Sequence, residues 1–544
     1  MIKRIFGTVL LLFSGLVARA DFATDDFINR AQGLPYEELR GLPLMHNGRI
    51  KPLESLARET SVYLTGSYNF KGINPIQLAL ALMLSEDSDS FPMIEVRSPE
   101  LRKQMNLASD RRHFALKELL NANLEGLATP LLQKQKSNKR SLTELENKTI
   151  EAYEQAILFQ NLRSGGLIVE AMYPPGADGM HAQSMPTGPI MDEFKALMGG
   201  VSSHNPDEYQ RHSAQLQQLL LNQKWPEGIS SNVGNIDKEL FYNTYKPFRW
   251  ACWLFFLMAV LMLAPKAADK INAKILPAVL FIPIVFLILG FYIRVSITGF
   301  APVTNMYGTM IWVSLGVATF GWLFYLLYRN RVFLALTFSG AFVLLFLTDQ
   351  IPLVISPDMD PIVAVLRSNL WLTIHVLTIT ISYAAFSIAM LLGNTMIIRD
   401  LMGLNSAEWI KTYSHFCYRT MQLGVFLLSI GIILGGVWAD YSWGRFWGWD
   451  PKETWALIAD LGFLILLHAR HIGWVDSYRL LLLAPLSYLL VIMAWYGVNF
   501  ILATGLHSYG FSSGGAMIVF VFVSAQLVLI GAALAKKFVL AKRS

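Results

Sequence analysis

The sequence has little cysteine and little charge. Its two cysteines, Cys252 and Cys417, lie far apart, in or beside apolar runs. No CxxC is present, which argues against a thiol oxidoreductase, and no CxxCH is present, so the chain is not itself a c-type cytochrome. Charged residues make up only 15% of the chain, and the formal net charge is a modest +6. This balance gives no reason to expect a nucleic-acid partner.

Apolar residues dominate instead. Of the 544 residues, 53% are hydrophobic, with 33 Phe and 14 Trp, which is too apolar for an ordinary soluble protein. We therefore predict an all-α polytopic membrane protein with about nine transmembrane helices. The apolar runs that predict these helices are 249–265, 275–295, 308–328, 331–348, 370–394, 420–438, 454–470, 479–500 and 515–536.

The sequence divides into three regions, of which the last is the membrane core. Residues 1–20 carry two basic residues ahead of a short apolar run and end in Ala18-Arg19-Ala20. This is typical of a signal peptide, although an uncleaved N-terminal anchor is the alternative. Residues 21–248 have the composition of a soluble domain, which we expect to be exported and mostly helical. Residues 249–544 form the transmembrane domain.

The distribution of Lys and Arg predicts the orientation of the membrane helices. Starting from an exported Phe248, every second connection is rich in these residues, and the intervening connections are much poorer. Basic connections face the cytoplasm by the positive-inside rule. We therefore expect a protein of the bacterial cytoplasmic (inner) membrane with 349–369, 438–455 and 501–514 on the periplasmic side. The basic residues are Lys266, Lys270, Lys274, Arg329, Arg331, Arg399, Lys411, Arg419, Arg470, Arg479, Lys536, Lys537, Lys542 and Arg543.

The tryptophan segment, Trp438–Trp455, lies between two of the apolar runs and reads WADYSWGRFWGWDPKETW. It contains five Trp, separated by Gly444 and Gly448, and closes with an acid, a proline, a base and a second acid. Indole faces stack on large planar ligands at little entropic cost, and glycine allows a close approach. An interfacial Trp belt is the simpler alternative. A belt, however, needs neither the glycine spacing nor an acid and a base at fixed positions.

The pattern W-G-x-x-W-x-W-D-P-K-E-T-W resembles the tryptophan-rich (WWD) signature of the haem-handling membrane proteins of cytochrome c maturation. The similarity is strongest to the CcsA/ResC type, with CcmC and CcmF as more distant relatives. Leu42–Glu59 resembles, more weakly, a sequence ahead of the membrane core in some larger CcsA proteins. The resemblance implies that 249–544 is a cytochrome c assembly domain for which haem b is both ligand and substrate. The residues that it implies for haem binding in this segment are Trp443, Trp447, Trp449, Asp450 and Trp455.

Two histidines flank the tryptophan segment in sequence and are predicted on its side of the membrane. His375 comes about one turn into a helix that starts near Leu370, and His507 lies in the loop between the last two helices. Two imidazoles on opposite sides of a plane can supply both axial ligands of a haem iron, although a single interfacial histidine is more often structural. The resemblance implies that WLxxHV at His375 and GxHSYG at His507 are the family's external ligand pair.

A third histidine lies deeper. His468, in LLHARHIGW, is about 20 Å from the outer end of its helix at the standard rise. A snorkelling helix-end histidine is the alternative, but an ionisable residue at this depth is a functional candidate. Its LHAR context is similar to that of a membrane-embedded haem ligand in the family. No second histidine inside a transmembrane run can pair with it, so the resemblance implies that a separate CcsB/ResB-type membrane subunit supplies the partner ligand.

The remaining histidines are expected to bind no metal. His415 and His471 fall in polar connections, and the soluble-domain histidines lack metal-site spacing and are expected on its surface or in loops. Cations near the outer face could neutralise haem propionates, with solvation at the interface as the alternative for Arg294 and Arg367. The soluble-domain histidines are His46, His113, His181, His204 and His212, and the four cations are Arg294, Arg367, Arg445 and Lys452. Asp450 and Glu453 could form local ion pairs with Lys452 or Arg445.

The leading hypothesis is a haem lyase (holocytochrome c synthase) component of system II, active only with its CcsB/ResB-type partner. Haem held at the periplasmic face would be presented for thioether attachment to the CxxCH segment of an apocytochrome c, and thiol-reducing proteins would act only indirectly. No catalytic residue is assigned beyond the haem site. One alternative is a haem exporter or chaperone that serves a separate ligase. A respiratory subunit with permanent b-type haem is a weaker alternative, because His507 lies in a loop.

Overall fold

The computed structural model describes residues 22–137, 142–173, 187–226, 233–301, 303–351, 355–359, 361, 370–502 and 515–541. His507, Arg367, His181 and the first 20 residues lie outside these ranges, so the predictions made for them stay predictions. The chain forms two compact units. Unit 1 comprises Met1–His46 and Ile50–Ile236, and unit 2 comprises Asn47–Arg49 and Asp237–Ser544.

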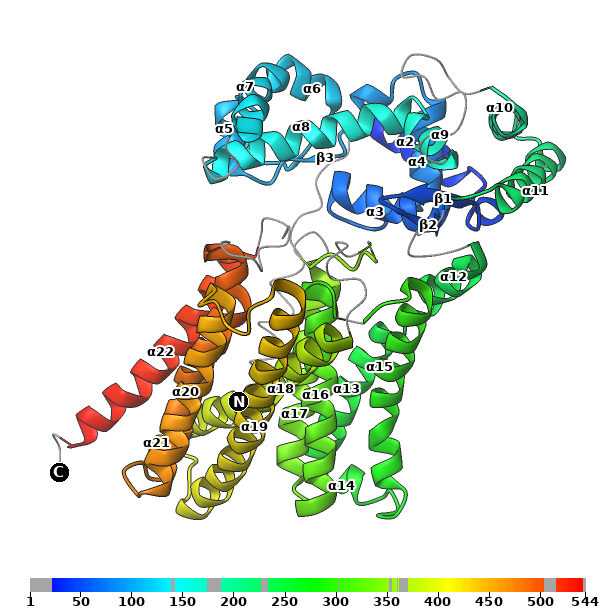
Figure 1. The fold of residues 1–544 in the computed structure, drawn as a ribbon. Helices are drawn as coiled ribbons and strands as arrows, with labels where there is room; N and C mark the ends of the chain where they lie inside the picture. The colour runs from blue at the N-terminus through cyan, green and yellow to red at the C-terminus, as the bar shows by residue number, and fades with distance from the viewer. Residues whose placement is uncertain are drawn as a thin grey trace. The chain divides into compact units, whose positions relative to one another are not determined.

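Unit 1 is mainly helical, with two short two-stranded sheets, β1-β2 and β3-β4 (Figure 1). Its helices are α2 (Phe22–Gln32), α3 (Leu53–Thr65), α4 (Pro75–Leu84), α5 (Pro99–Gln104), α6 (Leu116–Asn121), α7 (Leu124–Ser137), α8 (Glu144–Arg163), α9 (Gly166–Met172), α10 (Pro189–Ser202) and α11 (Pro206–Asn222). Its strands are β1 (Pro43–His46), β2 (Arg49–Pro52), β3 (Ile94–Glu95) and β4 (His113–Phe114). Short 3₁₀ helices are η1 (Glu37–Leu39), η2 (Phe70–Gly72), η3 (Ser88–Ser90) and η5 (Val233–Asn235).

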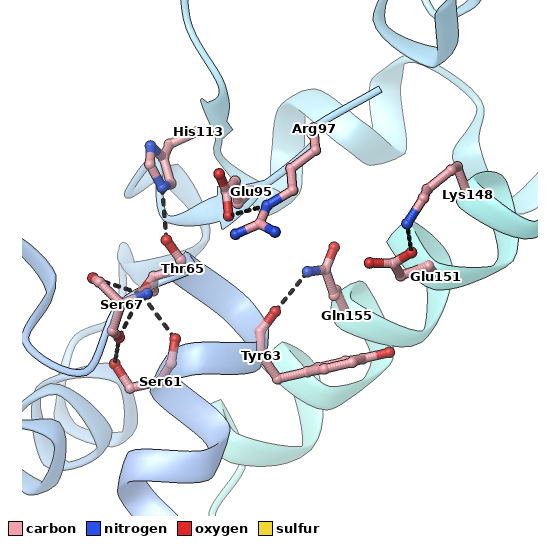
Figure 2. A network of polar contacts seen from close by, with 10 residues as sticks. All are labelled: Ser61, Tyr63, Thr65, Ser67, Glu95, Arg97, His113, Lys148, Glu151 and Gln155. Carbon is pink, nitrogen blue, oxygen red and sulfur yellow. Dashed lines mark hydrogen bonds and ion pairs between the residues drawn. The ribbon is translucent and has the colours of Figure 1, made fainter. Parts of the chain in front are cut away.

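The carboxyl end of α3 is held by side chains from other elements of unit 1, as Figure 2 shows. A helix leaves its last carbonyls without intrahelical partners. Here Gln155 of α8 donates from Nε2 to the Tyr63 carbonyl at 2.6 Å, and Nε2 of His113 in β4 lies 2.9 Å from the Thr65 carbonyl. Gly66 ends the helix with φ +78°. His113 thus lies in a strand and fixes a helix end, whereas the sequence predicted a surface or loop histidine.

Unit 2 is a bundle of mostly long helices, which run side by side and are joined by shorter ones (Figure 1). They are α12 (Ile236–Tyr245), α13 (Pro247–Leu263), α14 (Pro265–Ala268), α15 (Leu276–Thr298), α16 (Met306–Tyr328), α17 (Arg331–Gln350), α18 (Leu370–Leu401), α19 (Ala407–Trp443), α20 (Pro451–His471), α21 (Ser477–Ile492), the π-helix η7 (Met493–Leu502) and α22 (Ala516–Ala541). Both cysteines are buried and free in this unit.

Eight helices in the described part of the chain are long and apolar enough to cross a membrane. They confirm an all-α polytopic membrane protein and account for eight of the nine predicted spans. The ninth predicted span is α20, which forms a 21-residue helix and packs against α19, α21 and η7. Its apolar character is reduced by polar residues at both ends and one near the middle, namely Lys452, Glu453, Thr454, Asp460, His468, Arg470 and His471.

A buried ion pair joins two parts of unit 2 that lie far apart in sequence. The Arg49 guanidinium donates to both carboxylate oxygens of Glu239, at 2.7 and 3.0 Å. The two side chains are only 1% and 2% exposed. Breaking such a pair by removing one partner costs about 3–5 kcal/mol, because the other charge is left buried without compensation.

The contacts at the end of α3 predict the effect of a single substitution. Gln155→Ala removes the donor to the part-buried Tyr63 carbonyl, which costs about 1–3 kcal/mol. Amide exchange in 61–67, followed by mass spectrometry on the full chain, should accelerate by about fivefold or more. Lys148→Ala removes a part-buried pair with Glu151 within α8, away from the carbonyls at the end of α3, and should leave exchange there unchanged. Equal rates in both variants would contradict this account.

Candidate functional site

His375 lies in a groove formed by glycines of the neighbouring helix. Its side chain extends from the first turns of α18 and is half-buried against α19. Nδ1 lies 2.8 Å from the Gly431 carbonyl oxygen. A Cβ built on Gly435 would lie 2.4 Å from Cε1 of the ring, so the imidazole occupies the space that a side chain there would fill. The absence of side chains at these glycines lets the ring approach the α19 backbone.

The hydrogen bond to Gly431 determines the tautomer of His375. A carbonyl oxygen can only accept, so Nδ1 carries the proton and donates it, and Nε2 is the nitrogen suited to bind iron. Metal-binding histidines are commonly oriented in this way by a hydrogen bond from the other nitrogen. The residues present therefore fit the chemistry of a haem ligand at His375.

Aromatic rings continue from His375 into the tryptophan segment. The Trp438 ring is almost parallel to the imidazole, at 8° and 6.5 Å between centroids, and is fully buried at 1% exposure. Trp443 meets Trp438 edge to face at 4.6 Å. A continuous set of rings thus leads from the candidate ligand to the end of α19, where Gly444 closes the helix with φ +70°.

The acidic residues of the tryptophan segment start α20. Asp450 is its N-cap and accepts from the Lys452 amide at 3.0 Å, Pro451 occupies the first turn, and Glu453 completes a capping box. Glu453 also accepts from the amides of Gly448 and Asp450, at 2.8 and 3.2 Å. This is the arrangement that satisfies the unpaired amides of a helix start. The W-D-P-K-E part of the motif therefore fixes the geometry of the segment.

Arg445 lies over the middle of the segment. Its guanidinium is 5.7 Å from the Trp443 ring centroid, and its Nη1 is 3.8 Å from Glu453, as the predicted local ion pair requires. A Cβ on Gly448 would fall 1.0 Å from Nη1, so a side chain there would force this guanidinium to move. The Phe446 ring similarly covers Gly436 of α19. Of the two glycines noted in the sequence, Gly448 is used for close contact, whereas Gly444 meets nothing within 4 Å and instead supplies the left-handed backbone that ends α19.

The remaining tryptophans differ in exposure. Trp447 and Trp449 meet edge to face at 5.8 Å, and Trp449 is 70% exposed with φ +55°. Trp455, in the first turn of α20, is half-buried. The segment therefore combines a rigid, buried inner part with an exposed aromatic surface, which is the type of surface that holds a large planar ligand.

The structure does not bring His468 to this site. It lies near the other end of α20, is exposed, and has Nδ1 2.8 Å from the Leu464 carbonyl. In the described ranges, no group of three or more His, Cys, Asp or Glu side chains could hold a metal ion. A role for His468 would therefore need ligands from elsewhere, as the prediction of a partner subunit assumes.

Arg294 has a different setting from either predicted alternative. It is only 5% exposed, and it donates to the Pro357 and Asp358 carbonyls at 2.9 and 3.4 Å. Its guanidinium also lies over the rings of Tyr242 and Tyr307. It therefore anchors the 355–359 segment and is neither solvated nor presented to a ligand.

Sequence reasoning missed the groove that holds His375. The signal was present as the run Gly431-Ile-Ile-Leu-Gly435-Gly436, since small residues four apart allow close helix packing in membranes. The run of glycines does not identify the side chain that packs against it, because many side chains of α18 could have filled the groove.

The fold and the site together define a polytopic helical membrane protein with an aromatic, histidine-containing site built from α18, α19 and the start of α20. A family model described as "Cytochrome C assembly protein" matches residues 303–507. The chain is 36% identical over 245 residues to the cytochrome c biogenesis protein CcsA of Guillardia theta, covering 39% of this chain and 78% of that protein. It is 33% identical over 270 residues to CcsA of Prochlorococcus marinus, covering 43% and 85%.

The chain belongs to the CcsA family of cytochrome c biogenesis proteins, which confirms the resemblance carried by the tryptophan segment. A longer similarity, 28% identity over 493 residues, is found to protein NrfI of Wolinella succinogenes. It covers 85% of this chain, and the match spans about half (53%) of NrfI.

The glycine groove predicts the effect of a methyl group beside His375. Gly435→Ala must push the imidazole away from α19 and break its hydrogen bond to Gly431, at an overpacking cost of about 1–3 kcal/mol. Labelling of His375 by diethyl pyrocarbonate, measured by mass spectrometry, should increase. Gly531→Ala in α22, where the added atom meets nothing within 4 Å, should leave labelling unchanged. Unchanged labelling in Gly435→Ala would refute the groove.

Proposed function

We propose that this chain performs its part in cytochrome c biogenesis by holding haem b against the tryptophan segment, with His375 and His507 as axial ligands. The observation that carries the proposal is the setting of His375, whose Nδ1 is engaged by the Gly431 carbonyl and whose ring lies parallel to Trp438. Such an imidazole is oriented before any ligand arrives, so little entropy is lost on binding. His507 enters the proposal through the GxHSYG motif.

Within this proposal the tryptophan segment positions the macrocycle. Half-buried Trp447 and exposed Trp449 provide apolar faces, and capping by Asp450 fixes where the loop ends and α20 begins. Arg445 offers a cation for a propionate, because its guanidinium has Glu453 as a partner only at 3.8 Å and can form bidentate contacts with a carboxylate.

The proposed reaction is thioether attachment to the CxxCH segment of an apocytochrome c. Each substrate S–H adds across a haem vinyl group, so that a C–S bond forms, the hydrogen ends on the other vinyl carbon, and nothing is released. The protein contributes the position of the haem and the electronic effect of its ligands, and the reactivity belongs to the haem and the thiols.

The proposal also includes the side of the membrane on which haem is held and a partner subunit. The tryptophan segment faces the periplasm of a bacterial inner membrane, as the positive-inside rule predicts. A CcsB/ResB-type subunit supplies a second ligand to pair with His468, which is exposed on α20 and thus accessible to a neighbouring helix. Haem lyase activity is then a property of the pair.

A haem exporter or chaperone that passes haem to a separate ligase is the second candidate. The position of His468 far along α20 from the tryptophan segment supports it, because two separate ligand positions suit a transfer route. Holocytochrome formation by this chain with only its partner subunit present would separate the two candidates, since an exporter alone would form no product.

The ligand assignment predicts the absorption spectrum of the protein purified with its partner. His375→Gly and His507→Gly should each lose the low-spin haem spectrum and abolish cytochrome c maturation, and added imidazole should restore the spectrum by replacing the missing ligand. His415→Gly, which removes a histidine assigned no ligand role, is the matched control and should retain both. Unchanged haem in the first two variants would remove them as ligands.

A further inference from the structure

A buried acid lies inside the helix bundle, away from the site described above. Asp460 follows the first residue of α20 by nine positions, about 14 Å along the helix axis, and its side chain is only 5% exposed. Asp460 is not one of the proposed haem ligands, and it takes part in none of the contacts described for the tryptophan segment.

The two carboxyl oxygens of Asp460 have different surroundings. Oδ2 accepts a hydrogen bond from the Ser429 hydroxyl of α19 at 2.7 Å. Oδ1 is fully buried and has no hydrogen-bond partner among the residues that the structure describes. A buried carboxylate requires donors or a cation, and one with an unsatisfied oxygen is strongly disfavoured.

In the described part of the chain, the helix stretches around Asp460 carry no positively charged side chain. Besides α20 itself, these are α19, α21 with η7, and α18, whose Phe386 stacks on Phe463 one turn away. The ranges 376–398, 420–439, 454–467 and 480–502 contain no Lys, Arg or His, and Asp460 is their only acid. The other titratable side chains in these ranges are those of Tyr383, Tyr488 and Tyr496.

Six other acids of unit 2 show one way in which this chain pairs a carboxylate. Each has an oxygen 2.6–3.8 Å from the nitrogen of a Lys or Arg side chain. These pairs are Glu239 with Arg49, Asp269 with Arg331, Asp349 with Arg249, Asp400 with Lys536, Glu453 with Arg445 and Asp476 with Arg479. Asp460 has a hydroxyl in place of the cation, which suits a neutral acid.

We propose that Asp460 and Ser429 form a proton-binding site inside the bundle, in which Asp460 carries the proton at neutral pH. The Ser429 hydroxyl donates to Oδ2, so the proton resides on Oδ1, where it is available to an acceptor that enters the bundle. Ionisable residues within membrane helices commonly serve as proton relays or mark a substrate pathway. The inference does not depend on haem binding at His375.

The protonation state can be measured by infrared difference spectroscopy on the full-length protein at pH 7. Wild type minus Asp460→Asn should contain the C=O stretch of a protonated carboxylic acid, which shifts in D₂O. Ser429→Ala should shift that band, because the hydrogen bond to Oδ2 is lost, without converting it to carboxylate bands. Asp476→Asn, which replaces an exposed acid paired with Arg479, should instead lose carboxylate bands.

Carboxylate bands in the wild-type minus Asp460→Asn spectrum would overturn the proposal, because Asp460 would then be an ionised residue that only links two helices. If Asp460→Asn does not accumulate, wild type labelled with 4-¹³C-aspartate can be compared with Asp460→Glu. Loss of the labelled acid band would support the site, and loss of labelled carboxylate bands would overturn it.

Discussion

The contact between α18 and α19 at Gly431 and Gly435 determines the geometry of the candidate site. With no side chains at these positions, an imidazole from α18 reaches the α19 backbone and donates to a carbonyl. In a membrane, helices associate through close packing and interhelical hydrogen bonds more than through the hydrophobic effect. This one contact therefore both packs two helices and sets the direction of the candidate ligand.

The tryptophan segment combines two kinds of residue with separate tasks. Its polar members, Asp450 and Glu453, satisfy the amides at the start of α20 and so determine how the chain leaves the loop. Its aromatic members extend from buried Trp438 to exposed Trp449. Because the polar residues are engaged in local hydrogen bonds, the aromatic surface is held in place and remains presented to solvent or a ligand.

The sequence allowed the membrane helices and the family to be predicted, because helix length, hydropathy and the W-G-x-x-W-x-W-D-P-K-E-T-W motif are local properties. Even α20 was predicted, although Asp460 and His468 reduce its apolar character. The groove at Gly435 and the burial of Arg294 could not be predicted, since each depends on which distant segment packs there. Strands β1 and β4, which contain His46 and His113, were also missed, because two-residue and four-residue strands carry almost no periodic signal.

The pairing of Arg49 with Glu239 has a consequence for the order in which the protein is made. The two residues are separated by 190 positions, so at 5–20 residues per second Arg49 leaves the ribosome roughly 10–40 s before its partner. During that interval the guanidinium has to stay hydrated, because burial without Glu239 is costly. Burial of Arg49 in unit 2 therefore follows synthesis of all of unit 1, which ends at Ile236.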